Sequence, residues 1–161
     1  RSVGRLRLEP AAPPANPDAV RAIETADLIV LGPGSLFTSI LPPLLVPGIR
    51  DAVLGASARR VYVANLLQEP AETIGYDAAT HVERLRRHAD LRIVDTVLVP
   101  AVRRVRAPGL IPVDFDRDAI AAQGVEVAVG RILDDLGFHH DARRLAQALL
   151  RLERRDVVPV R

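Results

Sequence analysis

The stretch ADLIVLGPGSLFTSILPPLL, residues 26–45, indicates how this chain folds. Its apolar run over 28–31 predicts a short buried strand, which stops at a Gly-Pro-Gly-Ser turn over 32–35 before apolar residues resume. Glycines let the backbone approach a ligand closely, and a strand that ends in a glycine turn is where α/β proteins hold phosphate groups. The stretch therefore predicts a strand and an anion-binding turn, with a tight turn capped by Ser35 as the alternative interpretation.

Further strands and helices follow at the spacing of an α/β protein. Strands are expected at 5–8, 60–65, 93–99, 111–115 and 124–129, and helices at 51–58, 77–87, 117–122 and 138–155, besides one that begins at Pro17. Asn16, Asp116 and Asp141 are expected to cap helices. The alternation predicts an α/β fold with a mostly parallel sheet and helices on both faces, in one domain over 1–161 with a loose tail over 153–161.

Two polar loops are expected to lie side by side in this fold. Right-handed crossovers place every loop that follows a strand at one edge of the sheet, and residues 32–39 and 65–73 each follow a strand. The second loop offers the amide, carboxylate and hydroxyl groups that contact with a sugar or ribose requires, at Asn65, Gln68, Glu69, Glu72 and Thr73. A polar loop without a ligand is the alternative.

Composition argues against several classes of protein. The pI of 9.9 accompanies a net charge of only +2, because every basic residue is arginine and few groups titrate above neutral pH. Aromatic residues make up 3% of the chain, too few for base stacking, so nucleic-acid binding is not expected. No apolar run approaches the roughly 20 residues of a membrane helix and no signal peptide is evident, so no membrane insertion and a cytoplasmic location are expected.

The histidines form no recognised catalytic or metal-binding pattern. His81 shares a helix face with apolar residues and is expected to pack in the core. His139, His140 and Asp141 are adjacent, but no further ligand stands at chelating spacing, so no metal is expected. Asp141 is interpreted as a helix cap, with both histidines turned toward the ligand edge or solvent. No nucleophile and base stand in a known order, so no catalytic residue is assigned.

Three segments carry a resemblance to a known family: ADLIVLGPGSLFTSILPPLLVPGIRDAV (26–53), VYVANLLQEPAETIGYDAATHVERL (61–85) and HHDARRLAQALL (139–150). With them the chain resembles the gluconeogenesis-factor (YvcK/CofD-like) family of UDP-sugar-binding proteins, whose relatives include the 2-phospho-L-lactate transferases of deazaflavin cofactor synthesis. The similarity runs from about residue 4 to residue 152. It covers only the carboxyl-terminal half of the family fold, so the amino-terminal strands and their glycine-rich nucleotide loop are expected to be absent.

The resemblance implies a Rossmann-like fold that binds a nucleotide-sugar such as UDP-N-acetylglucosamine. The implied function is that of a regulatory protein linked to carbon metabolism, cell-wall synthesis and cell shape, without a cofactor. A 2-phospho-L-lactate transferase-type enzyme is the alternative, and a homo-oligomer is left open. The implied ligand-binding residues are Gly32, Pro33, Gly34, Ser35, Leu36, Phe37, Thr38, Ser39, Asn65, Glu72, Thr73, His139 and His140.

The sequence departs from the family pattern in three places. The usual Thr-Gln-Pro-Gly-Glu-Thr stands here as Gln-Glu-Pro-Ala-Glu-Thr over 68–73, which changes the polarity of the loop and replaces a glycine with Ala71. His139 stands where an arginine is common. A tyrosine expected near Val105 is also missing. The losses of this tyrosine and of the arginine argue against binding of the same sugar.

Overall fold

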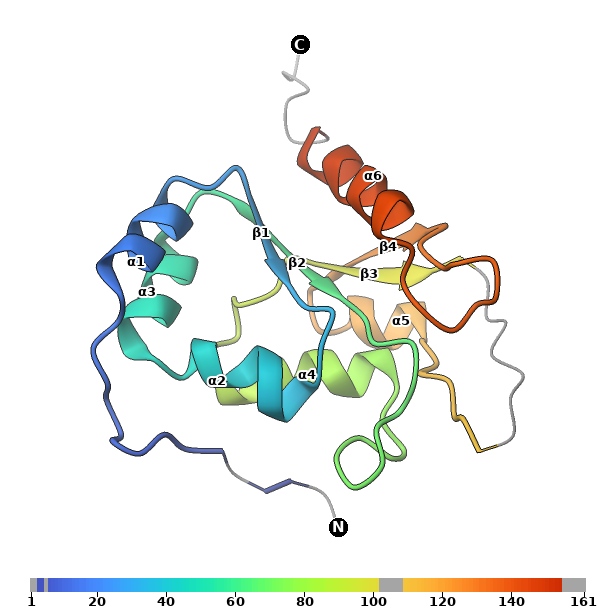
Figure 1. The fold of residues 1–161 in the computed structure, drawn as a ribbon, viewed down its shortest axis with the longest axis horizontal. Coiled ribbons are helices and arrows are strands. Elements are labelled where there is room, and N and C mark those ends of the chain that lie inside the picture. The colour runs from blue at the N-terminus through green and yellow to red at the C-terminus, as the bar shows by residue number, and fades with distance from the viewer. Residues whose placement is uncertain (1–2, 5, 102–108, 155–161) are drawn as a thin grey trace.

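The computed structural model describes residues 3–4, 6–101 and 109–154 (Figure 1). Four parallel strands form one sheet in the order of the sequence: β1 (Leu28–Leu31), β2 (Arg59–Val63), β3 (Thr96–Pro100) and β4 (Glu126–Gly130). β1 and β4 are the two edges of this sheet. The predicted α/β fold with a parallel sheet is therefore confirmed.

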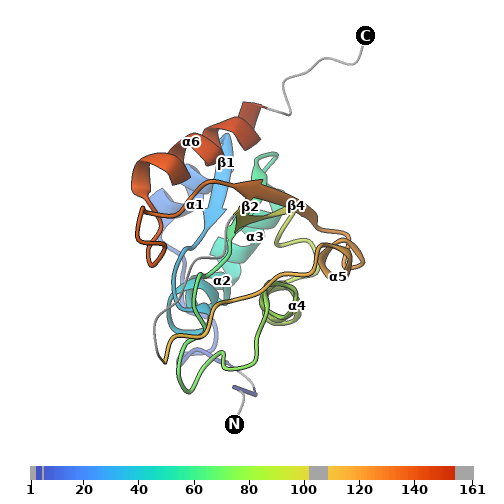
Figure 2. The ribbon, with the colours of Figure 1, turned by 90° about the vertical axis from the view of Figure 1, so that its right-hand side faces the viewer.

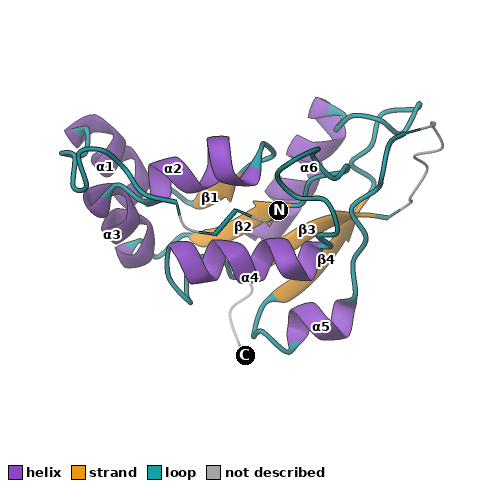
Figure 3. Cartoon of the chain, turned by 90° about the horizontal axis from the view of Figure 1, so that it is seen from below, coloured by secondary structure: helices purple, strands orange, loops and turns teal. Residues whose placement is uncertain are grey.

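The helices between the strands cover one face of the sheet, and the last helix covers the other (Figures 1 and 3). Right-handed crossovers in a sheet of sequential order place the connecting helices on the same face. These helices are α2 (Leu41–Leu44), α3 (Pro47–Gly55), α4 (Ala78–His88) and α5 (Arg117–Ala121). Helix α6 (Ala142–Glu153) lies across the opposite face (Figure 2), which confirms the expectation of helices on both faces.

Two apolar clusters correspond to these two layers. Side chains alternate between the faces of a strand, so Tyr62 of β2 belongs to the larger cluster while Val61 belongs to the smaller one. The larger cluster also holds Leu85 of α4 and Ile120 of α5, and the smaller one holds Leu152 of α6. The core is therefore thickest on the face that carries α2 to α5.

Side-chain caps begin four of the helices. Asn16 accepts from two main-chain N–H groups at the start of α1 (Pro17–Glu24), which packs against α3. Asp116 likewise accepts from two N–H groups at the start of α5, and Asp77 and Asp141 each accept from one at the start of α4 and α6. An oxygen at the cap satisfies N–H groups that the first turn of a helix leaves without partners. The expected caps at Asn16, Asp116 and Asp141 are thus confirmed.

Two predicted strands are absent from the described chain. Residues 6–8 are irregular, and Arg5 lies outside the described residues. Residues 111–115 make only one isolated bridge, between Pro112 and Leu67. Alternating apolar residues form a strand only where a neighbouring strand offers free N–H and C=O groups, and each of these segments lies away from the sheet.

Some predicted boundaries also shift. The helix expected at 51–58 begins earlier, at Pro47, because the fixed φ of proline suits the first position of a helix. Residues 138–140 precede α6, since Asp141 caps it. Within the tail expected to be loose, Glu153 still belongs to α6, and residues 155–161 lie outside the described residues.

In the described part of the chain, no single helix is long and apolar enough to cross a membrane. One pair of segments, Leu36–Leu44 and Pro47–Gly55, reaches that length and composition together, but the two are bent by 78°. Its large side chains, among them Phe37, Leu41 and Val53, are buried in the larger core cluster. Length and composition alone therefore give only weak support for a membrane segment here.

Candidate functional site

The loops after β1 and β2 lie against each other at the carboxyl edge of the sheet (Figure 1). A Cβ atom added at Gly32 would lie 3.3 Å from the carbonyl oxygen of Val63, the last residue of β2. Phe37 of the first loop packs edge-on against the ring of Tyr76, with 6.4 Å between the centroids. The structure therefore places the first loop against the residues on either side of 65–73, namely Val63 and Tyr76, and both loops follow adjacent strands at one edge, as the order of the strands predicts.

The glycine turn exposes main-chain donors. Gly32 has a φ of +86°, a conformation that residues with side chains rarely adopt. The main-chain oxygen of Ser35 accepts from the N–H groups of Ser39 at 2.9 Å and Ile40 at 3.0 Å, which begins the π-helical segment η1 (Leu36–Ile40). Among the described residues, no acceptor is found for the N–H groups of Gly34 and Ser35. Free N–H groups before a helical segment can bind an anion.

The residues after this turn separate into two groups. The side chains of Leu36 and Phe37 are buried, with exposed fractions of 0% and 3%, and they pack in the core. Those of Thr38 and Ser39 are exposed. Pro33 is exposed as well. Leu36 and Phe37 therefore hold the turn in place through packing, while the surface offers the hydroxyl groups of Thr38 and Ser39 to a ligand.

Asn65 lies near the start of the second loop, shortly after the end of β2. Its side chain is 8% exposed, and Nδ2 donates to Oε1 of Glu69 at 3.1 Å. The other end of the amide, Oδ1, is buried and has no partner among the described residues. Thr73 is fully buried, and its Oγ1 accepts from the N–H of Glu69 at 2.8 Å, which closes the loop. Thr73 thus shapes the loop, whereas Asn65 has a free acceptor.

Glu72 lies beside a second carboxylate. Burial and the nearby charge of Glu69 raise the pKa of Glu72 above its ordinary value. Its Oε2 atom is buried and has no partner among the described residues. The carboxyl group therefore holds its proton more readily than an exposed glutamate, and it can donate a hydrogen bond to a ligand oxygen when protonated.

The two neighbouring histidines have different surroundings. His140 lies next to the main chain of Ala64, at the end of β2, and burial lowers its pKa below the ordinary value. Its Nε2 atom is buried without a partner among the described residues. The His139 side chain is 81% exposed, and its Nδ1 lies 3.4 Å from a carboxylate oxygen of Asp134. The structure thus brings a neutral His140 to the second loop and leaves His139 at the surface.

Three ring side chains, those of Tyr62, Tyr76 and His81, pack together next to the second loop. The sequence analysis did not assign them to the site. His81 stacks on Tyr62 at 6.4 Å between centroids and meets Tyr76 edge-on at 5.7 Å. His81 Nδ1 lies 2.8 Å from the carbonyl oxygen of Asp77, and burial lowers the pKa of His81 while it raises that of Tyr62. His81 is therefore a packing residue, as predicted. Tyr62 stands in an apolar strand and Tyr76 between Gly75 and Asp77, so neither gave a sequence signal.

Across the described residues, no group of three or more histidine, aspartate and glutamate side chains is placed to hold a metal ion. The polar groups at this edge of the sheet are main-chain N–H groups, hydroxyls, the amide of Asn65, the imidazole of His140 and the neighbouring carboxyl groups of Glu69 and Glu72. Such a set recognises the oxygen atoms of a polar organic ligand. It is compatible with binding and contains no evident nucleophile.

Comparison with known proteins places the chain in a family. The family model described as 2-phospho-L-lactate transferase CofD matches residues 1–133. The gluconeogenesis factor of Bacillus subtilis (strain 168) is 38% identical over 160 residues, which cover 93% of this chain and 50% of that protein. The gluconeogenesis factor of Halalkalibacterium halodurans is 36% identical over 160 residues, which cover 93% of this chain and 49% of that protein.

A solved structure shows the same fold. The crystal structure of a Bacillus halodurans protein, described as a member of the UPF0052 family, aligns with a TM-score of 0.85 and 33% sequence identity. The alignment covers 93% of this chain and 51% of the other. The chain thus spans about half the length of these relatives. With its family match over residues 1–133, this chain belongs to the CofD family, and the relatives named above are gluconeogenesis factors.

Proposed function

We propose that the protein binds a nucleotide-sugar of the UDP-N-acetylglucosamine type and acts as a regulatory protein linked to carbon metabolism and cell-wall synthesis. One observation carries the proposal. At the edge where the loops after β1 and β2 meet, buried Asn65 Oδ1 and buried His140 Nε2 have no partner among the described residues. A buried polar atom without a partner is costly, so a ligand that satisfies it is favoured.

The two loops suit different parts of such a ligand. The free N–H groups of Gly34 and Ser35 and the exposed hydroxyls of Thr38 and Ser39 suit the oxygens of a diphosphate. Asn65 can accept from a sugar or ribose hydroxyl through Oδ1. Neutral His140 can exchange a hydrogen bond with the same hydroxyls without adding charge.

The proposal includes a site that this chain forms only in part. Strand β1 is an edge, and a cavity of about 420 Å³ runs along it, lined by Gly32, Pro33 and Ser39 together with apolar side chains such as Ile29 and Val30. No charged residue lines this cavity. Because the relatives are about twice as long, we infer that this chain is the carboxyl-terminal part of a larger fold whose other strands pair with β1 and complete the site.

An enzyme of the 2-phospho-L-lactate transferase type is the second candidate, supported by the family model that matches residues 1–133. Such an enzyme would move a phosphate-linked lactyl group onto a deazaflavin alcohol. Transfer at phosphorus depends on positioned cations that offset charge. Within the described chain, no cluster of acidic side chains suited to a metal stands at this edge, so the acidic ligands of such an enzyme would have to come from the rest of the larger fold.

The test is calorimetry on the full-length protein that contains this chain, titrated with UDP-N-acetylglucosamine. The informative variant is Asn65→Ala, which removes the free acceptor and one hydrogen bond to Glu69. The matched control is Asn16→Ala, because Asn16 is the only other asparagine in the sequence and caps α1 away from this edge. We expect affinity to fall about tenfold in the first variant and to stay unchanged in the second.

Absence of binding by the unaltered protein at millimolar ligand would rule the proposal out. The transferase alternative is tested separately, by incubating the protein with a guanylyl-activated lactate donor and a deazaflavin alcohol. Product that depends on the protein would favour the enzyme. Equal binding by both asparagine variants would place the ligand elsewhere on the molecule.

A further inference from the structure

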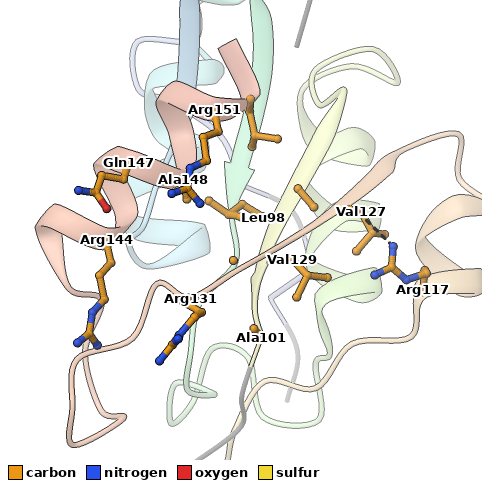
Figure 4. Close-up of a pocket in the computed structure, with 13 residues that line it drawn as sticks. Leu98, Ala101, Arg117, Val127, Val129, Arg131, Arg144, Gln147, Ala148 and Arg151 are labelled. Atoms are coloured by element: carbon orange, nitrogen blue, oxygen red, sulfur yellow. Dashed lines mark hydrogen bonds between the residues drawn. The ribbon is translucent and has the colours of Figure 1, made fainter. Parts of the chain in front are cut away.

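The second edge of the sheet, at β4, borders a cavity of about 580 Å³ whose charged lining residues are all arginines (Figure 4). We call this cavity the arginine groove and define it by Arg117, Arg131, Arg144, Gln147 and Arg151 together with β4. Arg144, Gln147 and Arg151 lie along one side of α6, while Arg117 reaches β4 from α5. Three separate elements therefore bring positive charge to one strand.

The main chain of β4 offers hydrogen-bonding groups to this groove. The N–H of Glu126 donates to Asp95, and the carbonyl of Gly130 accepts from Ala101, so alternate residues of β4 face β3. The groups of Val127 and Val129 therefore point away from the sheet. Arg117 Nη1 donates to the carbonyl oxygen of Val127 at 3.2 Å, in agreement with that direction. The Val129 side chain is 44% exposed, so this part of the edge is open.

In the part of the chain that the structure describes, two of the four arginines of the groove have side chains that are free to bind a ligand. Within the described chain, the side chains of Arg131 and Arg151 make no hydrogen bond or ion pair. Arg144 is held by two partners: Nη1 donates to the carbonyl oxygen of Leu133 at 2.5 Å, and Nη2 pairs with Asp135 at 2.6 Å. The Asp135 side chain is 89% exposed, so this half of the guanidinium can exchange Asp135 for another carboxylate. No acidic residue lines the groove. Unpaired arginines around an open strand favour an occupant that carries carboxylates.

Two other occupants fit less well. A second copy of this chain paired edge to edge would place the arginines of one groove against those of the other, and like charges oppose such pairing. A single-stranded nucleic acid requires aromatic side chains for base stacking, and none lines the groove. A peptide strand would form hydrogen bonds with both the N–H and the C=O group of Val129, and neither of the other occupants would do so as completely.

We propose that the arginine groove is a docking site for an extended acidic segment of a partner protein, which adds to β4 as a fifth strand. Alternate side chains of the segment face opposite sides of the sheet. Carboxylates on one side meet Arg144 and Arg151, and a carboxylate on the other side meets Arg117. Main-chain hydrogen bonds to Val127 and Val129 supply affinity that does not depend on the sequence of the segment.

The test uses a fluorescein-labelled peptide of alternating valine and glutamate, titrated with the protein at low salt and followed by anisotropy. The variant is Arg131→Gln with Arg151→Gln, and the control is Arg143→Gln with Arg154→Gln, which removes the same charge from exposed arginines outside the groove. We expect affinity to fall about tenfold in the variant and less than about twofold in the control. The amide protons of Val127 and Val129 should exchange more slowly with the peptide bound.

Each other result overturns the proposal. Equal losses in variant and control would show attraction by net charge alone. Loss in the variant without slower exchange at Val127 and Val129 would show an anion site that does not extend the sheet. Tighter binding of a single-stranded oligonucleotide of equal charge would assign the groove to nucleic acid, and absence of peptide binding at millimolar concentration would leave β4 without this role.

Discussion

Replacing Gly32 with alanine tests whether the turn after β1 needs glycine for its backbone conformation and for its close approach to β2. The φ of Gly32 is +86°, and an L-residue in the left-handed region costs about 1–2 kcal/mol. The new Cβ would also lie 3.1 Å from Ile40 Cδ1 and 3.3 Å from the carbonyl oxygen of Val63. The side chain of Ile40 can rotate, but the carbonyl belongs to β2 and cannot move without disturbing the sheet.

Crowding of this kind adds about 1–3 kcal/mol, so the free energy of unfolding should fall by about 2–5 kcal/mol in Gly32→Ala. The matched control is Gly75→Ala. Gly75 has a φ of +85°, and nothing lies within 4 Å of its added Cβ, so this variant carries only the backbone term of about 1–2 kcal/mol. The difference between the two variants therefore measures the contact with Val63 and Ile40.

Urea unfolding followed by circular dichroism provides the measurement, with the midpoint and the slope fitted for each variant. The expected order of stability is unaltered protein, then Gly75→Ala, then Gly32→Ala. A loss in Gly32→Ala no greater than in Gly75→Ala would refute the reasoning, because the approach of the turn to Val63 would then carry no energetic weight.

Three further changes have expected outcomes. Ala71 has a φ of +65°, so Ala71→Gly should raise the free energy of unfolding by about 0.5–1 kcal/mol in urea titrations. The pKa of Glu72 is raised above 4.5 in the folded protein, so the folded state keeps a proton that the unfolded state loses, and the free energy of unfolding falls as the pH rises above 4.5. Glu72→Gln should therefore raise the urea midpoint at about pH 7 and leave it unchanged at about pH 4. Asp95 accepts at 2.8 Å from the N–H, Nε and Nη2 of Arg60, so Asp95→Ala should lower the thermal midpoint through a loss of about 1–2 kcal/mol, whereas Asp51→Ala, at an exposed ion pair, should have little effect.

The fold followed from local patterns to a large extent. The apolar run at 28–31 forms β1 as predicted, and the polar caps at Asn16, Asp116 and Asp141 begin helices where they were expected. These features depend on hydrogen bonds between residues a few positions apart and on side chains that alternate within one element. The strands expected at 5–8 and 111–115 are absent from the described chain, because a strand needs a neighbouring strand to pair with. No local sequence pattern shows whether such a neighbour lies nearby.

The candidate site was predictable in its position but not in the role of each side chain. The order of parallel strands was enough to bring residues 32–39 and 65–73 to one edge. The strand order could not predict whether a loop side chain faces a ligand or the core. Leu36 and Phe37 pack inward, whereas the next two residues, Thr38 and Ser39, are exposed. The polar spacing also gave no indication that Thr73 would be fully buried and serve to close its loop.

The sequence by itself determined most of the strand and helix segments, the capped helix starts and the glycine turn, since each depends on short-range geometry and periodicity. Only the tertiary structure decided that His140 lies against Ala64, and that arginines from α5, α6 and the segment after β4 surround one open strand. Those contacts join residues far apart in the chain. They exist because apolar packing on both faces of the sheet fixes where each element lies, and side-chain spacing along the sequence carries no record of that placement.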